Sequence, residues 1–277
     1  MKEVAQITVY DSASQGSPAV EELLSLLKYR YLIVQLVRRD ILTRYKRSAL
    51  GVAWTMLNPL GTMLILTIVF SQAFGGSQKG YAAYVLSGLI AWNFFAQSTN
   101  AATLHLVWGG SLLKKIYIPR TSFAVSATGT GLINLLLSLI PLVLVMLIIR
   151  VPIRWTIVFL PIPILFLTMF ALGIGLLVST MAIYYADIAE MYQILLTAWM
   201  YLSPVIYSPE ILPEAYRQWI TLLNPMYYLI ELFRMPIYYG QVPDIGLLLV
   251  SAGISIFTLI IGWIFFTSKS DEFAYRV

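Results

Sequence analysis

Six long apolar runs occupy most of this chain of 277 residues, and no charged side chain interrupts their interiors. The runs cover residues 52–74, 82–107, 121–149, 155–182, 191–207 and 245–267. A helix of roughly 20 residues crosses the hydrocarbon core of a bilayer, and each run reaches or approaches that length. The sequence therefore predicts an all-α polytopic membrane protein, with six transmembrane helices in one domain over residues 48–277.

The lack of charge within the runs also limits the mechanism. Hydrophobic residues make up 59% of the chain and charged residues only 11%, whereas soluble domains are about 25% charged. Transporters driven by protons or ions usually need ionisable groups inside their spans. Between the fifth and sixth runs, Glu231 is the one acid that we expect in a segment lying against the membrane. A secondary transporter is therefore disfavoured, and we expect the energy for transport to come from another subunit.

Several kinds of site lack the residues they need. The chain has no cysteine, which excludes disulfides and thiol chemistry. Its single histidine, His105, cannot form a histidine-based metal site alone, and we interpret it as an interfacial residue. The glycine-rich turn at 75–80 lacks the Gly-Lys-Ser/Thr order of a phosphate loop. We expect no metal or cofactor in this chain, and no nucleic-acid partner despite the net charge of +5.

The distribution of lysine and arginine predicts the orientation. With a cytoplasmic N-terminus, thirteen of these residues fall inside and five outside. The outside residues are Lys79, Arg150, Arg154, Arg217 and Arg234. The positive-inside rule then places both termini in the cytoplasm.

The N-terminal region divides into a tail at residues 1–16 and an amphipathic helix at 17–47. Ser17-Pro18 is typical of a helix start, and apolar side chains recur at steps of three or four from Leu27 to Tyr45. Basic residues form much of the polar face, namely Arg38, Arg39, Arg44, Lys46 and Arg47. Such a helix lies in the membrane interface and contacts anionic lipids. The alternative is a helix that packs on cytoplasmic protein.

Two connecting regions contain more apolar residues than simple loops need. The cytoplasmic loop at 109–120 carries Leu112, Leu113, Ile116, Tyr117 and Ile118 beside its charges, which indicates a small helix docked on lipid or on a partner protein. The external region 208–243 is apolar but is cut by five prolines. Two short helices that dip into the outer leaflet would fit, provided that protein or water covers their irregular backbone. The alternative is a hairpin lying flat on the membrane.

Three blocks of sequence resemble the permeases of type-2 ABC exporters of cell-surface polysaccharides. The first is Arg44–Gly51 with Trp54–Pro59, the second is Leu113–Arg120, and the third is Tyr201–Tyr207 with Asn224-Pro225 and Phe233-Arg234. One departure is Tyr185-Ala186-Asp187, where family members often show an Arg-Asp pair.

The resemblance implies a homodimer in the bacterial inner membrane with two ATP-binding subunits, which would hold ATP and magnesium. The substrate would be a polysaccharide on a polyprenyl diphosphate, as in O-antigen export, and teichoic acid and capsule exporters share the same blocks. The resemblance assigns coupling to the ATPase to Leu113, Lys114, Lys115, Ile116, Tyr117, Pro119 and Arg120. It assigns an external gate to Pro204, Pro209, Trp219, Asn224, Pro225 and Tyr228.

A sugar polymer needs a wettable path, because each unpaired polar group costs several kcal/mol in hydrocarbon. Aromatic rings suit the C–H faces of sugars, and neutral amides and hydroxyls can bond the sugar hydroxyls. Two predicted helix faces supply such groups, and we predict that they line the channel: Trp54, Asn58, Thr62 and Gln72 on the first run, and Tyr192, Trp199 and Ser203 on the fifth. The alternatives are interfacial aromatic residues and polar contacts between helices.

Two other functions stay open at this point. A drug or small-lipid exporter of the same fold would need an apolar cleft rather than a wettable path. A membrane glycosyltransferase would need clustered acids at the interface, and Asp187 with Glu190 is the only cytoplasmic acidic pair near a run.

Overall fold

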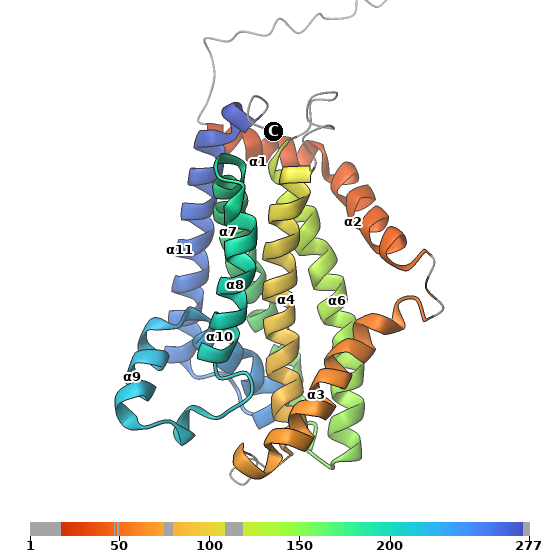
Figure 1. The fold of residues 1–277 in the computed structure, drawn as a ribbon, viewed down its shortest axis with the longest axis vertical. Coiled ribbons are helices and arrows are strands. Elements are labelled where there is room, and N and C mark those ends of the chain that lie inside the picture. Colours follow the sequence, from red (N-terminus) through yellow and green to blue (C-terminus); the bar gives the residue numbers. More distant parts are fainter. Residues whose placement is uncertain (1–17, 47, 49, 75–79, 109–118, 274–277) are drawn as a thin grey trace, which may run out of the picture.

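The fold is a bundle of long helices, shown in Figure 1. The computed structural model describes residues 18–46, 48, 50–74, 80–108 and 119–273. Within these residues every regular element is helical and no strand occurs. The predicted all-α class is therefore confirmed.

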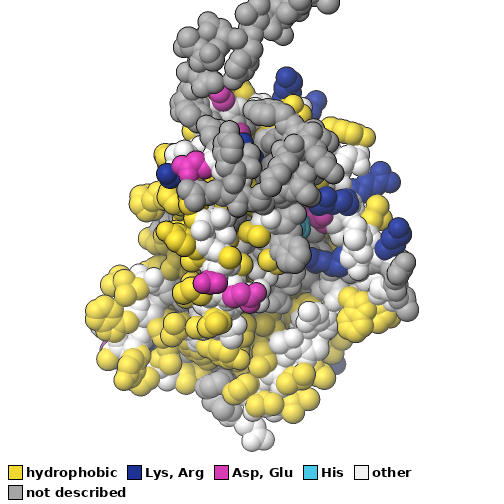
Figure 2. Space-filling view, turned by 45° about the horizontal axis from the view of Figure 1, so that its top comes forward, with side chains coloured by type: hydrophobic (Ala, Val, Ile, Leu, Met, Phe, Trp, Pro, Cys, Tyr) yellow, Lys and Arg dark blue, Asp and Glu magenta, His cyan; other side chains and the backbone are white. Residues whose placement is uncertain are grey.

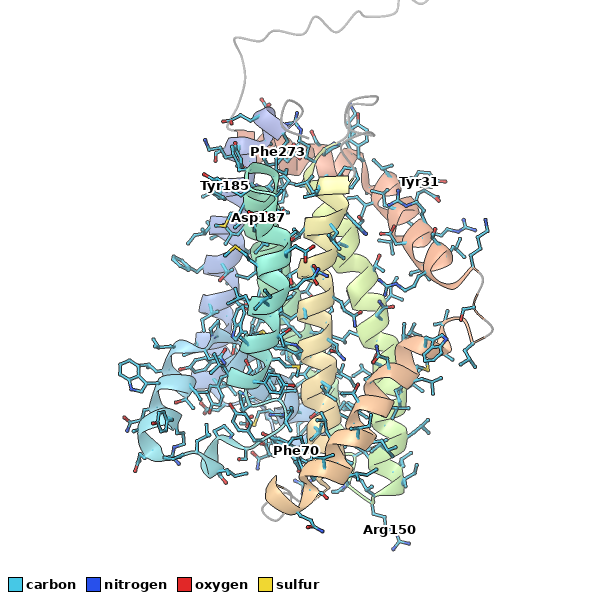
Figure 3. All side chains as sticks on the ribbon, in the orientation of Figure 1. Tyr31, Phe70, Arg150, Tyr185, Asp187 and Phe273 are labelled. Carbon is cyan, nitrogen blue, oxygen red and sulfur yellow. The ribbon has the colours of Figure 1, made fainter. Side chains whose placement is uncertain are left out.

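The long helices of the described chain each overlap one of the six predicted runs. They are α3 (Ala53–Phe74), α4 (Tyr81–Trp108), α6 (Thr121–Ile148), α7 (Pro161–Tyr184), α8 (Asp187–Leu202) and α11 (Ile245–Lys269). A 3-10 turn, η3 (Trp155–Phe159), precedes α7, and another, η6 (Ser270–Glu272), follows α11. The loop between α7 and α8 contains Tyr185, and Asp187 begins α8 (Figure 3).

Four spans in the described chain are long and apolar enough to cross a membrane, namely α3, α6, η3 with α7, and α11. These four confirm a polytopic membrane protein. The α4 helix has 28 residues but is more polar, and α8 has 16 residues, which corresponds to about 24 Å. The count of six spans therefore stays a prediction.

The polarity of α4 follows from its central position, because α4 packs against α3, α6, α7, α8 and α10. Tyr84 and Phe95 are fully buried. The hydroxyls of Thr99 and Thr103 donate to backbone carbonyls one turn earlier in α4, at 2.9 and 3.0 Å. Protein rather than lipid surrounds much of this helix, so it tolerates polar side chains.

The predicted N-terminal helix at 17–47 is two helices in the structure, α1 (Pro18–Lys28) and α2 (Arg30–Tyr45), with a break at Tyr29. The apolar stripe is divided as well. Leu27, Tyr31 and Val34 are exposed, whereas Leu36 is buried where α2 packs on α6. Figure 3 shows Tyr31 on the outer side of α2.

Two side-chain contacts fasten α1 to the bundle. The Glu22 carboxylate accepts hydrogen bonds from the backbone N–H and the hydroxyl of Thr121, at 3.2 and 2.9 Å. The Trp263 indole donates to the Ala19 carbonyl at 3.0 Å. Since Trp263 lies near the end of α11, α1 and the C-terminal end of α11 lie at the same end of the bundle (Figure 1).

The proline-rich region contains two short helices, α9 (Glu214–Leu223) and α10 (Pro225–Arg234), as the prolines predict. They are preceded by the 3-10 turn η4 (Pro209–Ile211), and α10 continues into the π-helical turn η5 (Met235–Tyr239). Whether α9 and α10 enter the outer leaflet stays a prediction.

Candidate functional site

A cavity of about 280 Å³ lies between α2, α3, α4 and α6. Four carboxamide side chains line it from three helices, and we call it the amide cavity. Its lining residues are Arg44, Ser48, Trp54, Thr55, Asn58, Pro59, Ile90, Asn93, Phe94, Gln97, Gly131, Asn134, Leu135 and Ser138. The Ser138 hydroxyl, 3.3 Å from the Thr55 carbonyl, links α6 to α3 within this wall.

A second, more open groove of about 350 Å³ runs between α4 and α8. Its lining includes Asn100 from α4 with Gln193 and Thr197 from α8. Gln97 lines both the groove and the amide cavity. The polar side of α4 is therefore a wall that the two hollows share, and their described linings contain one charged residue, Arg44.

The channel-lining residues predicted on the first run divide into two pairs. Trp54 and Asn58 line the amide cavity. Thr62, one turn further along, is half-buried and lies outside its lining, and Gln72 is exposed near the far end of α3. The structure thus brings together only the first pair.

Of the residues predicted to share a face on the fifth run, Tyr192 and Trp199 both contact α4, whereas Ser203 lies beyond the helix. A channel-lining role for them stays a prediction. Tyr192 is buried and its hydroxyl bonds Thr99 of α4 at 2.7 Å. Ser203 is buried beyond the end of α8 in extended backbone, because a residue before proline, here Pro204, is disfavoured in helical geometry. The helix ends at Leu202, so the predicted boundary at 207 was five residues too late.

The third residue of that set, Trp199, is half-buried and takes part in an aromatic cluster. Its ring meets Trp92 and Phe95 of α4 edge-on, with ring centres 6.1 and 5.2 Å apart. Its indole donates to the Asn224 side chain at 2.9 Å. In this conformation Trp199 joins α8 to α4 and α10.

Sequence reasoning missed the amides of α4. Asn93, Gln97 and Asn100 occur at steps of four and three, which places them on one side of a helix. That spacing was available as a signal, but the run was interpreted only as an apolar span. In the structure this side of α4 forms the wall common to the amide cavity and the groove.

Arg234, at the end of α10, is fully buried. Its guanidinium donates to the carbonyls of Pro204, Val205 and Tyr84, at 2.7, 2.9 and 3.2 Å. The guanidinium carbon lies 3.7 Å from the centre of the Tyr84 ring, a cation–π geometry. The Glu231 carboxylate lies 4.0 Å away. The count of external charges included Arg234, but its surroundings make it an internal anchor.

The non-helical turn after α8 has its carbonyls bound by side chains from other elements. We call this unit the carbonyl clamp. Its bonds run from Asn224 to Leu202, from Arg234 to Pro204 and Val205, from Tyr81 to Ile206 and from Tyr84 to Tyr207, over 2.7–3.1 Å. Irregular backbone at membrane depth needs such internal partners. The clamp therefore gives the carbonyls at the end of α8 hydrogen-bond partners inside the protein.

The predicted gate residues separate into three groups by their exposure. Pro204 and Asn224 are buried in the carbonyl clamp, and the Asn224 side chain also caps α10 by accepting from the Met226 N–H at 3.0 Å. Trp219 on α9 is 65% exposed. The other three are half-buried: Pro209 in η4, Pro225 at the start of α10, and Tyr228 within α10.

Most of the predicted coupling segment, Leu113, Lys114, Lys115, Ile116 and Tyr117, lies outside the described residues. Pro119 is buried and Arg120 is half-buried just before α6. Thr121, the first residue of α6, is the one that Glu22 binds. The N-terminal helix α1 is therefore attached directly beside this segment.

The basic face predicted for the N-terminal helix follows α2. Arg38, Arg39, Arg44 and Lys46 are exposed, and Arg47 lies outside the described residues. Figure 2 shows lysine and arginine side chains gathered over α2 and hydrophobic side chains over much of the rest of this face. Contact with anionic lipids stays a prediction.

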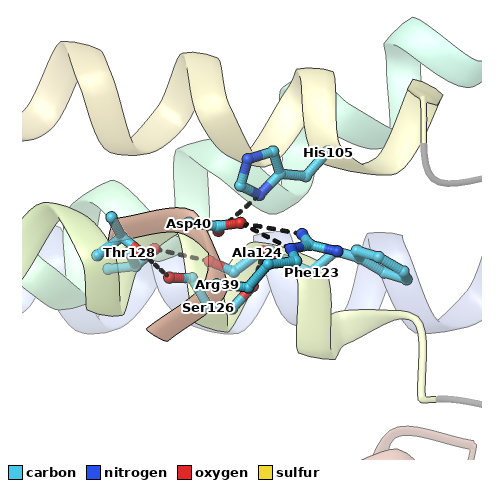
Figure 4. A network of polar contacts seen from close by, with 8 residues as sticks. Arg39, Asp40, His105, Phe123, Ala124, Ser126 and Thr128 are labelled. Carbon is cyan, nitrogen blue, oxygen red and sulfur yellow. Dashed lines mark hydrogen bonds and ion pairs between the residues drawn. The ribbon is translucent and has the colours of Figure 1, made fainter. Parts of the chain in front are cut away.

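His105, predicted as an interfacial residue, is half-buried and faces α2. Its Nδ1 lies 3.6 Å from Asp40 Oδ2, and the Arg39 guanidinium holds the other Asp40 oxygen at 2.9 Å (Figure 4). His105 of α4 therefore lies beside the middle of α2, but neither its Nδ1 nor Asp40 Oδ2 has a hydrogen-bond partner among the described residues.

The sequence matches the ABC-2 type transporter family over residues 31–238. This chain belongs to that family. It is 30% identical over 254 residues to the O-antigen export system permease protein RfbA of Myxococcus xanthus, which covers 91% of this chain and 97% of that protein. An RfbA permease of Klebsiella pneumoniae is 25% identical over 82% of this chain and 90% of its own length. The capsule polysaccharide export inner-membrane protein CtrC of Neisseria meningitidis is 26% identical over 78% of this chain and 82% of its own length. The family predicted from the three sequence blocks is confirmed, and it is a family of transport permeases.

Proposed function

We propose that this chain is the membrane-spanning subunit of an ATP-driven exporter that moves a lipid-linked, O-antigen-like polysaccharide across the bacterial inner membrane. Two copies would form the permease, with two separate ATP-binding subunits that hold ATP and magnesium. Both termini would lie in the cytoplasm, on the side of those subunits.

The observation that carries this proposal is the polar wall of α4 with its neighbours. Asn93, Gln97 and Asn100 face two hollows whose other walls supply hydroxyls, amides and the Trp54 ring. Neutral amides can donate and accept hydrogen bonds with sugar hydroxyls, while aromatic faces suit sugar rings. An apolar drug could not form hydrogen bonds with these amides, so the wall favours a hydroxyl-rich substrate.

A dimer would complete the path. The groove between α4 and α8 is open on one side, and α8 also exposes Ile194 and Leu195 outside the groove lining, at 73% and 55%. A second copy opposite this face would turn an open groove into an enclosed one. The exposed apolar residues of α8 would then pack against the second copy instead of facing water.

The ATPase would act on the segment from Leu113 to Arg120, as the family resemblance implies. Replacing Tyr117 or Lys115 by alanine should uncouple the complex, so that ATP hydrolysis no longer responds to the permease and surface glycan falls. The measurements are ATPase rate and cell-surface glycan. Normal export from a permease with this segment scrambled would contradict the coupling role.

The substrate is tested by deletion and by reconstitution. Loss of the chain should remove a surface polysaccharide, and vesicles that hold the permease and its ATPase should export lipid-linked glycan only with ATP. The likeness to CtrC makes a capsule polymer the second candidate, so the glycan that disappears on deletion must be identified. Export by vesicles that contain this chain without an ATPase would overturn the proposal.

A further inference from the structure

The amide cavity holds several polar side chains that have no partner within the described chain. Asn58, Asn93, Gln97 and Asn134 make no side-chain hydrogen bond to any described residue. They come from α3, α4 and α6, so no single helix explains their convergence. Asn58 and Gln97 are exposed, and Asn93 and Asn134 are half-buried. Their donors and acceptors are therefore accessible, and four amides that converge on one cavity can together bond a ligand rich in hydroxyls.

Arg44 is the one charged residue of that lining, and it forms no ion pair or hydrogen bond with the described residues. It comes from the last turn of α2. Its neighbours on α2 have other surroundings: Arg38, Arg39 and Lys46 border a separate hollow, and Arg39 binds Asp40. A guanidinium fork without a carboxylate partner matches the planar oxygens of a phosphate or carboxylate.

The size and the aromatic lining restrict the ligand further. About 280 Å³ lies at or below the small end of ligand pockets, which run from roughly 300 to 1,000 Å³. The cavity therefore suits one ring with a substituent, not a length of polymer. Trp54, beside Asn58 on α3, offers an aromatic face to such a ring.

We propose that each subunit holds, in its own amide cavity, one hydroxylated sugar ring that carries or adjoins an anionic group. The amides bond the ring hydroxyls and Arg44 bonds the anion. This inference rests on the proposed function but differs from it, because the site is built from one chain and lies beside the shared wall of α4. The anion has two possible sources, the diphosphate of a carrier lipid or the carboxylate of an acidic sugar.

The test measures binding to the intact complex of permease and ATPase in discs of neutral phospholipid. The probes are a short polyprenyl diphosphate bearing one N-acetylhexosamine, the same diphosphate without sugar, and a uronic-acid disaccharide without lipid. The variants are Arg44→Gln, Arg44→Lys and Asn93→Ala. The matched control is Arg30→Gln, since Arg30 is an exposed arginine of α2 outside the cavity.

We expect Arg44→Gln to weaken binding of an anionic sugar probe about tenfold, which equals about 1.4 kcal/mol, with a smaller loss for Arg44→Lys. Asn93→Ala should weaken the probes that contain a ring and leave the sugar-free diphosphate unchanged. If Arg44→Gln weakens binding of the diphosphate sugar, the carrier lipid is the source of the anionic group. If it weakens binding of the uronic-acid disaccharide, the source is an acidic sugar.

The inference is overturned if Arg44→Gln and Arg30→Gln bind every probe alike. It is also overturned if phosphatidylglycerol in the discs displaces the probes regardless of sugar, because the cavity would then hold a lipid headgroup. In either case glycan export by the wild-type complex, measured in parallel, shows whether the proposed function stands without this site. Absence of export by the wild-type complex would instead reject the function itself.

Discussion

The carbonyl clamp and the amide cavity both gather polar groups in an apolar bundle, but the clamp buries Arg234 and Asn224, whereas the cavity leaves its amides and Arg44 exposed or half-buried. In the clamp, side chains of Tyr81, Tyr84, Asn224 and Arg234 bind the carbonyls of the turn after α8. In the cavity, four amides and one guanidinium bind no described residue.

This difference separates structural polarity from polarity available to a ligand. A saturated network stabilises one conformation, and removing one member leaves the others unpaired. An open set of donors and acceptors contributes little to folding, so its members can be exchanged at small cost. The clamp should therefore be sensitive to substitution in stability, and the cavity should be sensitive in transport.

The largest expected effect is that of Arg234→Ala. The change leaves three carbonyls without their donor inside the protein, so we expect a loss of about 3 kcal/mol or more in stability. Thermal unfolding in detergent measures it. Arg217→Ala is the control, because Arg217 forms an exposed pair with Glu214 that contributes at most about 1 kcal/mol. Equal unfolding temperatures for the two variants would contradict the clamp.

Asn224→Ala should have the next largest effect. It removes the cap of α10 and the bonds to Trp199, Leu202 and Ser203, for an expected loss of about 2–4 kcal/mol. Asp244→Ala provides the comparison, since the exposed Asp244 caps α11 alone and its loss should cost about 1 kcal/mol. Thermal unfolding that ranks the two variants in the reverse order would refute a clamp role for Asn224.

Gly88→Ala tests whether the clamp is tightly packed. A Cβ at Gly88 would collide with the Arg234 guanidinium and lie 2.8 Å from the Val205 carbonyl oxygen. We expect a loss of about 1–3 kcal/mol in stability. At Gly61 a Cβ meets nothing within 4 Å, so Gly61→Ala should be neutral or stabilising by up to about 1 kcal/mol. Unfolding curves that show no difference between the two alanine variants would mean that the packing around Gly88 accommodates a methyl group.

Asn93→Leu should produce the smallest change in stability, and it tests the amide cavity as the other variants test the carbonyl clamp. Its amide binds no described residue, so stability should change by no more than about 0.5 kcal/mol. Glycan export by the reconstituted complex should nevertheless fall, because the cavity loses a polar wall. A destabilised variant with normal export would reverse the roles assigned to the two regions.

The sequence predicted the helices well because their signal is local. Uninterrupted apolar runs defined the long helices, and prolines divided the region between α8 and α11 into short ones. The end of α8 was also local, since Pro204 acts on the residue before it, but the apolar character of the following residues concealed it.

The site was less predictable because its contacts join distant parts of the chain. Arg234 binds carbonyls 30 residues away in the turn after α8 and 150 residues away in α4, which no spacing rule reveals. Tyr192 is an aromatic residue with a hydroxyl, as a channel lining needs, yet that hydroxyl is hydrogen-bonded to Thr99. The amides of α4 had a visible spacing, but only the packing of α3, α6 and α8 shows which hollows they face.

The bond between Glu22 and Thr121 has a mechanical consequence. It joins an N-terminal helix to the point where the chain re-enters the bundle, while the indole of Trp263 fastens the same helix to the last one. Three segments that are remote in the chain, namely α1, the start of α6 and the end of α11, are thus linked across one end of the molecule. A force applied at residue 119 is shared among them instead of travelling along α6 alone.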